Sequence, residues 1–311
     1  MQVEKFALTP ASPFPLKLKA YLAERFPLSV NGPAILLMFA SAFLVSAQLQ
    51  GAAVTIVSGR TALGILVLFF FFLRLRISDE HKDVHYDRIV NPDRLVVRGI
   101  VTLGELKAVG AFGLAVEVAA SWALGPEVFA TWVLAAFWSW LMHMEFFVDE
   151  WLRARPAIYM LTHMVIIPLL TGFCFQCARP FGPVGAPVGL ALFALASVLA
   201  TASLETARKI RLPADEAPGV ESYSSSWGFF PSLGVVGAMQ LGSLAILVGL
   251  RSALGLGPIF LAAAAVSWGL VVFALARFGV AQDRRLVGKL EKVAALYFMT
   301  VHIGLTASLW R

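Results

Sequence analysis

The most constraining feature of this sequence is a series of long apolar stretches, separated by short segments that carry proline, glycine or charged residues. A helix needs about 20 predominantly apolar residues to cross the hydrocarbon core of a bilayer. The stretches that approach or exceed this length cover residues 33–49, 53–73, 106–124, 128–148, 157–176, 187–205, 229–250, 257–276 and 292–310. The pattern predicts an all-α, polytopic membrane protein with nine transmembrane helices.

Composition agrees with this class and excludes others. Hydrophobic residues make up 59% of the 311 residues and charged residues 14%, whereas a water-soluble domain has about 25% charged residues. An aromatic content of 12% is too high for a disordered chain. The two cysteines, Cys174 and Cys177, are too few for a disulfide framework and lack a second pair for a zinc site. We therefore expect them to have a structural role.

Basic residues are distributed unevenly among the segments that connect the apolar stretches. If the N-terminus is cytoplasmic, almost all lysines and arginines of these segments face the cytoplasm, and the opposite side carries Arg179, Arg251 and Arg311. The positive-inside rule therefore predicts an integral protein of the cell or inner membrane with its N-terminus in the cytoplasm. The net charge of +6 is then a consequence of topology, and we expect no nucleic-acid partner.

The chain is expected to form one transmembrane domain. Residues 1–30 lack a continuous apolar core, so they are predicted to be a cytoplasmic leader rather than a cleavable signal peptide. Residues 31–311 are predicted to form the nine-helix domain. Its two long cytoplasmic loops are expected at residues 74–105 and 206–228.

The first of these loops contains a regular row of acidic residues. Asp79, Asp83 and Asp87 recur at i, i+4 and i+8, which places three carboxylates on one face if the preceding helix continues beyond Leu73. Like charges at this spacing repel each other, so the row does not stabilise a helix by itself. Divalent cations would relieve the repulsion, and Mg²⁺ prefers carboxylate oxygens and often shares its ligands with phosphate. The row therefore predicts a Mg²⁺ site.

Basic residues are interleaved with this acidic row. Lys82 and Arg88 lie within it, and Arg94 and Arg98 follow at a spacing of four. Ammonium and guanidinium groups bind phosphate oxygens through charge-assisted hydrogen bonds. Carboxylates for a metal beside cations for phosphate are the combination that diphosphate chemistry requires.

The second polar loop lies on the same predicted side of the membrane. It also mixes acids with bases, namely Glu205, Arg208, Lys209, Arg211, Asp215 and Glu216. We expect the basic triplet to bind substrate phosphate. The two loops together predict one site over a cavity between the helices.

Glu145 stands near the predicted cytoplasmic end of the fourth apolar stretch. Placing an ionisable residue within the bilayer has a large free-energy cost, so each such residue is a candidate functional residue. We predict that Glu145 is catalytic, because an acid facing the cavity could orient an acceptor or take a proton. The alternative is an interfacial acid that pairs with Arg153 or Arg155.

Other ionisable residues of the spans are interpreted as structural. Glu117 and Arg60 are expected to pair with each other across two spans. His163 and His302 are expected to be hydrogen-bonded residues that pack between helices.

The topology and the first loop resemble the UbiA superfamily of intramembrane prenyltransferases. Members of this superfamily have nine helices around a central cavity and two aspartate-rich motifs, on the cytoplasmic loops 2–3 and 6–7. The first family motif, N-D-x-x-D-x-x-x-D, is similar to residues 79–87, which read D-E-x-x-D-x-x-x-D. The resemblance implies that Asp79, Asp83 and Asp87 bind metal and are catalytic.

The same resemblance implies roles for the basic residues of the first loop. Arg94 and Arg98 match the family's R-x-x-x-R pair, which implies that they contact the diphosphate. Lys82 and Arg88 are then additional substrate-binding residues.

The second family motif, D-x-x-x-D, matches less closely. One alignment places Asp215 on the second aspartate but Arg211 on the first, where it cannot bind metal. Another alignment uses Glu205 and Lys209 and supplies one carboxylate. The resemblance thus implies an altered second metal site, for which Glu205 and Asp215 are the expected ligands and Glu216 a further candidate.

The function implied is Mg²⁺-dependent ionisation of a polyprenyl diphosphate and transfer of the prenyl group to an aromatic or lipid acceptor. An alternative is a UbiA-type terpene cyclase, in which the substrate's own chain captures the cation. A second alternative is a transporter or a non-catalytic lipid-binding membrane protein, although the chain has no matching pair of interrupted spans. CDP-alcohol phosphotransferases require D-x-x-D-G-x-x-A-R, which the first loop lacks.

Overall fold

A computed structural model describes residues 8–182, 186–216 and 222–310 of the chain. The described part is helical and contains no strand. Its long helices are α3 (Leu28–Leu49), α4 (Gly59–Val90), α5 (Leu103–Leu124), α6 (Pro126–His143), α9 (Ile166–Ala178), α10 (Val188–Arg208), α12 (Phe229–Gly249), α14 (Pro258–Ala281) and α15 (Arg284–Leu309). The shorter elements are α2 (Phe14–Arg25), α7 (Asp149–Arg153), α8 (Pro156–Met164), α11 (Tyr223–Trp227), α13 (Arg251–Leu254) and the single turns η1 (Glu145–Phe147) and η2 (Pro213–Asp215).

Every predicted apolar stretch is largely helical, which confirms a polytopic helical membrane protein. Within the described residues, 8 helical segments are long and apolar enough to cross a membrane. The remaining stretch forms α6, an 18-residue helix rich in tryptophan that packs between α5 and α9. The stretch at 157–176 forms two helices, α8 and α9. The break lies next to Met164, whose carbonyl would clash with the ring of Pro168 in a continuous helix.

The acidic segment belongs to a helix. Ser58 caps α4 by accepting a hydrogen bond from the backbone of Thr61, and the helix then runs for 32 residues. Its charged half is stabilised by Arg76, whose guanidinium lies 3.1 Å from Glu80 one turn later. The segment predicted as loop 74–105 is therefore mostly α4, and residues 91–102 make the connection to α5.

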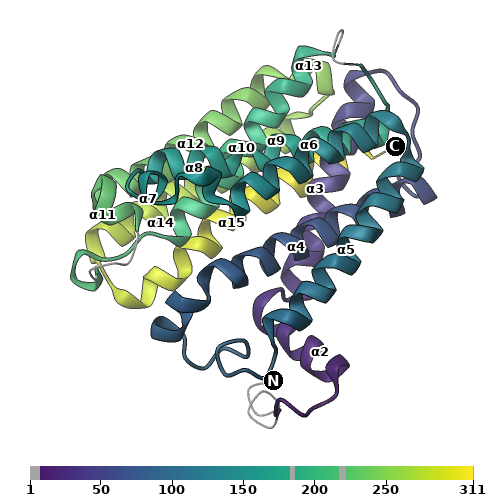
Figure 1. Cartoon of the computed structure of the whole chain (residues 1–311). Helices are drawn as coiled ribbons and strands as arrows, with labels where there is room; N and C mark the ends of the chain where they lie inside the picture. The colour runs from purple at the N-terminus through teal and green to yellow at the C-terminus, as the bar shows by residue number, and fades with distance from the viewer. Residues whose placement is uncertain (1–7, 183–185, 217–221, 311) are drawn as a thin grey trace.

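The long helices form a closed ring in chain order. Each contacts the next one from α3 to α6, then α9, α10, α12, α14 and α15, and α15 contacts α3. In Figure 1 the pair α4 and α5 lies on the opposite side of the bundle from α12 and α14. Helix α3 also contacts α9 and α10 across the ring.

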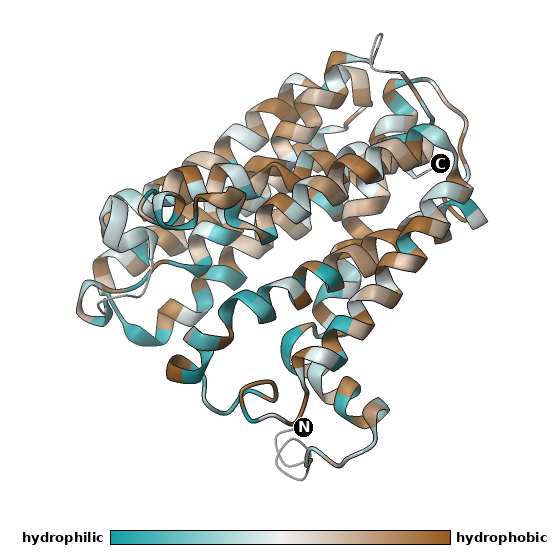
Figure 2. Ribbon diagram, viewed as in Figure 1, coloured by the Kyte–Doolittle hydropathy of each residue, from teal (hydrophilic) through white to brown (hydrophobic). Residues whose placement is uncertain are grey.

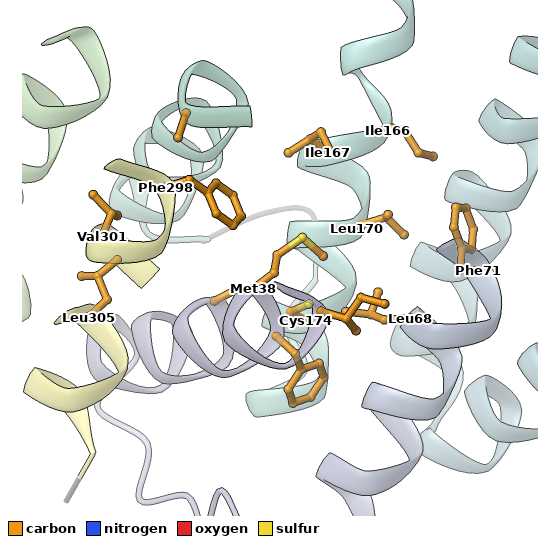
Figure 3. Packing of buried hydrophobic residues seen from close by; sticks show 14 of the residues in the cluster. Met38, Leu68, Phe71, Ile166, Ile167, Leu170, Cys174, Phe298, Val301 and Leu305 are labelled. Atoms are coloured by element: carbon orange, nitrogen blue, oxygen red, sulfur yellow. The ribbon is translucent and has the colours of Figure 1, made fainter. Parts of the chain in front are cut away.

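Apolar side chains fill the space around α3. Figure 3 shows Met38 of α3 near Leu170 and Cys174 of α9, with Phe298 and Val301 of α15 on its other side. Cys174 is fully buried and is a free thiol, as is Cys177. Both cysteines thus pack in the core, in agreement with the structural role predicted for them.

Polar side chains gather at one end of the bundle. Figure 2 shows hydrophilic residues concentrated where α4 ends, where α15 begins and around the segment that contains α11. We call this region the polar end. It contains the described parts of both predicted loops, while residues 217–221 of the second loop and residues 1–7 of the leader lie outside the described residues.

The leader contributes a helix that packs on the polar end. The backbone N–H of Leu95 donates to the carboxylate of Glu24 on α2 at 3.2 Å. On the same helix, Lys17 forms an ion pair with Glu105 of α5. These contacts attach the described part of the leader to the connection between α4 and α5.

Candidate active site

The three aspartates of the acidic row lie on α4, but their surroundings differ. The side chain of Asp79 is 48% exposed and lies 3.6 Å from Arg76. Asp83 is exposed, whereas Asp87 is buried. The helix therefore presents Asp79 and Asp83 to incoming ligands, while Asp87 is enclosed by protein.

Asp87 is held by residues that follow it in the sequence. Its carboxylate accepts a hydrogen bond from Asn91 at 3.1 Å and forms an ion pair with Arg94. Arg94 was predicted to contact diphosphate and Asp87 to bind metal, and the structure pairs the two with each other. Arg88 is exposed on the last turn of α4, and Arg98 follows in the connection to α5.

Glu80, which replaces an aspartate of the family motif, is buried and paired with arginines. It is 2% exposed, and its Oε1 atom accepts from Arg25 of α2 at 2.5 Å and from Arg76 at 3.2 Å. Two guanidinium groups thus neutralise this buried carboxylate. The contact also joins the leader helix to the acidic row.

The end of α10 faces the acidic row. Arg208 and Asp79 interact electrostatically across the gap between α10 and α4. Glu205 organises this end, because it lies 2.6 Å from Arg208 and 3.2 Å from Lys209. The structure therefore brings Asp79 of the first predicted loop near Arg208 of the second.

The remaining candidates of the second loop lie in other contacts. Asp215 forms an ion pair of 2.5 Å with Arg284 at the start of α15. Glu216 accepts hydrogen bonds from Ser222 at 2.8 Å and Ser224 at 2.7 Å. The backbone N–H of Arg211 donates to the Ser224 hydroxyl. These contacts tie η2 and α11 to their neighbours.

Glu145 is the centre of a buried polar cluster. Its Oε1 atom accepts from Lys82 of α4 at 2.8 Å and from the hydroxyl of Tyr159 of α8 at 3.2 Å. Its Oε2 atom lies 3.8 Å from Nε2 of His163. Glu145 therefore pairs with Lys82 rather than with Arg153 or Arg155.

The backbone around Glu145 is strained. Glu145, Phe146 and Phe147 have φ values of 46°, 54° and 61°, which place three successive residues with side chains in the left-handed region. Each such residue costs roughly 1–2 kcal/mol. This turn ends α6 at His143, before the predicted limit of residue 148, and directs the Glu145 side chain toward Lys82 and Tyr159. Strain of this kind is typical of functional sites.

A small pocket adjoins this cluster. Pro156, Tyr159, Lys209, Ser222 and Tyr223 line it. The Lys209 ammonium lies 5.8 Å from the ring centroids of both Tyr159 and Tyr223, a distance at which cations are attracted to aromatic faces. The pocket therefore presents one cation between two aromatic rings.

The predicted pair between Glu117 and Arg60 is wrong. Both oxygens of Glu117 accept from Arg74, at 2.9 Å and 3.0 Å. Arg60 instead donates to the carbonyls of Cys177 and Gln176 near the end of α9. Its position in the first turn of α4 brings it to the end of α9, where the last carbonyls of a helix lack partners within the helix.

Comparisons with known proteins identify the fold. No family model matches the sequence, and no curated protein matches it. Similar solved structures include one from a study of "Digeranylgeranylglyceryl phosphate synthase in membranes", with a TM-score of 0.64 and 20% identity over 94% of this chain and 98% of that chain. Another is the apo structure of a UbiA homolog from Aeropyrum pernix K1, with a TM-score of 0.64 and 18% identity over 88% of this chain and 96% of that chain. The chain has the UbiA fold.

In this UbiA fold, the exposed acids of α4 offer the type of ligand that Mg²⁺ prefers. Asp79 and Asp83 supply carboxylate oxygens, and Mg²⁺ commonly binds one or two carboxylates and completes its shell with water and phosphate. Within the described residues, no three His, Cys, Asp or Glu side chains gather closely enough to hold a metal. A Mg²⁺ ion at Asp79 and Asp83 would therefore take its other ligands from water or substrate.

The polar end of the UbiA fold also contains residues that were not predicted from the sequence. Tyr159 and Tyr223 were not among the candidates, and His163 was interpreted as a packing residue. Tyr159 and His163 stand four residues apart in an apolar helix, so one helix face carries both polar groups. That spacing could have indicated a polar site on this helix. The position of Tyr223, by contrast, depends on the packing of α11 against α12, which the sequence does not indicate.

Proposed function

We propose that this chain is a prenyltransferase of the UbiA superfamily. It would ionise a polyprenyl diphosphate in a Mg²⁺-dependent step and transfer the prenyl group to an aromatic or lipid acceptor. The observation that carries the proposal is the electrostatic interaction of Asp79 on α4 with Arg208 at the end of α10 in a UbiA fold. We place this polar end at the cytoplasmic face, because its loops are the basic ones.

The roles of the residues follow from their exposure and charge. Asp79 and Asp83 would hold Mg²⁺, which when bound neutralises charge on a leaving diphosphate. Arg208 and Lys209 would bind the diphosphate oxygens by charge-assisted hydrogen bonds. Glu205 contacts both bases and orients them.

The apolar part of the substrate would lie among the ring helices. Aromatic side chains lie next to Glu145 and His163, since Trp138 packs edge-on against Phe146 and Phe146 against His163. Aromatic faces stabilise cations through their quadrupoles. These rings would shield an allylic cation from water while the acceptor reacts with it.

The test is diphosphate release by the full-length protein in nanodiscs, with Mg²⁺ and farnesyl or geranylgeranyl diphosphate. We expect EDTA to abolish diphosphate release and added Mg²⁺ to restore it. The variants Asp83→Asn and Asp79→Asn should each lower the rate of diphosphate release by at least about 100-fold. Asp93→Asn removes an exposed acid beyond α4 and serves as the matched control. Unchanged turnover in Asp83→Asn would refute the assigned metal site.

Product analysis separates the alternatives. Prenylated acceptor that forms only when an acceptor is added supports transfer. A cyclic hydrocarbon or alcohol released without acceptor identifies a terpene cyclase instead. Absence of diphosphate release under all these conditions supports a transporter or a non-catalytic lipid-binding protein.

A further inference from the structure

The cluster around Glu145 contains two buried polar atoms that lack a hydrogen-bond partner among the described residues. They are Oε2 of Glu145 and Nε2 of His163. The two side chains are 8% and 13% exposed, and the two atoms lie 3.8 Å apart. Buried polar groups are almost always paired, so each exception calls for an explanation.

The hydrogen bonds of His163 define what the free nitrogen can do. Its Nδ1 atom lies 2.8 Å from the backbone carbonyl of Tyr159, which can only accept. In the neutral ring Nδ1 therefore carries the hydrogen, and Nε2 presents a lone pair. The free carboxylate oxygen of Glu145 is also an acceptor. Two acceptors that face each other need a donor between or beside them.

The surrounding charges select the kind of donor. Lys82 already neutralises Glu145 at 2.8 Å, and both Lys82 and Lys209 interact electrostatically with His163. A further ammonium group would be repelled by these two cations. A neutral ligand that carries a hydroxyl group satisfies the acceptors without adding charge.

The geometry of the cluster is held fixed around these two atoms. The rings of Tyr159 and His163 stack with centroids 4.0 Å apart at 11°, and the Tyr159 hydroxyl donates to Glu145. Tyr159 also interacts electrostatically with Asp79 and Asp83. The free acceptors thus lie beside the acids at which the diphosphate would bind.

We propose that Oε2 of Glu145 and Nε2 of His163 form the acceptor subsite and accept the proton of a hydroxyl nucleophile, an alcohol or a phenol. This inference rests on the proposed function. In the reaction, the C1–O bond of the prenyl diphosphate breaks and its electron pair leaves with the diphosphate. A lone pair of the acceptor oxygen forms the new C–O bond to C1. The hydroxyl proton moves to Nε2 of His163, and Glu145 stabilises the resulting imidazolium.

The variants Glu145→Gln and His163→Gln test this subsite in the full chain. Farnesyl and geranylgeranyl diphosphate serve as donors, with a 1-O-alkylglycerol as the alcohol and 4-hydroxybenzoate as the phenol. The measured quantity is the ratio of hydroxyl prenylation to acceptor-independent diphosphate release. We expect each variant to lower this ratio about 100-fold, the usual size of a proton-transfer contribution. The double variant should have nearly the same ratio as the single variant with the lower ratio, because the two groups act as a unit.

Matched controls separate the subsite from general damage. Glu150→Gln removes an exposed acid and His143→Gln an exposed histidine nearby, and both should retain the ratio. The dimethyl ether of the 1-O-alkylglycerol and 4-methoxybenzoate lack the hydroxyl hydrogen and should not react. Thermal unfolding verifies that each variant is folded, and His163→Gln carries the test if Glu145→Gln does not fold. The acceptor that reacts shows whether the hydroxyl belongs to an alcohol or a phenol.

Several outcomes overturn the proposal. A wild type that releases diphosphate, with variants that retain the wild-type ratio, refutes the subsite and leaves the proposed function standing. Prenylation of a ring carbon rather than the oxygen, or a cyclic product formed without acceptor, also refutes it. A wild type that releases no diphosphate refutes the proposed function and the subsite together.

Discussion

Substitution of Glu117 by glutamine should destabilise the protein by about 3 kcal/mol. Glu117 is fully buried in α5, and its carboxylate accepts two hydrogen bonds from Arg74 and one of 3.0 Å from the indole of Trp132. Removing one partner of a buried ion pair costs roughly 3–5 kcal/mol, because the other charge stays behind uncompensated. We take the lower end, since Arg74 is 20% exposed and still donates to Ser139 at 3.0 Å.

A double-mutant cycle isolates the pair. The assay is reversible unfolding in mixed micelles, followed by tryptophan fluorescence, for Glu117→Gln, Arg74→Met, Glu117→Met and the double methionine variant. Apolar replacement of both partners is often nearly neutral, so the double variant should be more stable than either single methionine variant. Glu127→Gln removes an exposed acid from α6 and should change stability by less than about 1 kcal/mol. Additive costs in the cycle, or a fully stable Glu117→Gln variant, would refute the assigned pair.

Three further predictions concern packing, backbone strain and burial. Gly64→Ala should lower stability by about 1–3 kcal/mol, because the new Cβ atom would lie 2.5 Å from the Phe39 ring; chemical denaturation measures this, and Phe39→Leu should partly restore it. Phe147→Asn should change stability by less than about 1 kcal/mol, since its φ of 61° suits asparagine better while the edge-on contact of its ring with Trp140 is lost; a larger shift of the unfolding midpoint would contradict this. Cys174 and Cys177 should react with a maleimide only after denaturation, because both are buried; mass spectrometry of native micelles would detect early labelling.

The helices and the acidic row were predictable because they depend on local sequence. Apolar length indicated each spanning helix. Residues 74–105 were predicted as a loop, and the spacing of Asp79, Asp83 and Asp87 indicated a shared face only on the condition that the preceding helix continues, as α4 does. The partner of Glu117 was not predictable in this way. It depends on how α4 and α5 are rotated against each other, and this rotation presents Arg74 rather than Arg60 to Glu117.

The cluster around Glu145 shows a second limit of local reasoning. Its members come from α4, η1 and α8, so neither the spacing of Lys82 nor that of His163 indicates their contact with Glu145. The left-handed turn that brings them together contains Phe146 and Phe147 and no glycine. A turn of this kind has no residue signature, because packing rather than propensity holds it in place.

Some acids at the polar end are paired with bases and others are exposed to solvent. This difference determines where a metal ion can bind with a small free-energy penalty. Three acids of α4 and η1 are already neutralised, Glu80 by two arginines, Asp87 by Arg94 and Glu145 by Lys82. A cation that binds to any of these must first displace a partly buried base, which leaves that base without its counter-charge. At Asp79 and Asp83 the carboxylates are exposed, and the ion pair of Asp79 with Arg76 is long at 3.6 Å, so Mg²⁺ would displace mainly water. For this reason we expect these two acids, rather than the whole row, to determine the dependence of activity on Mg²⁺.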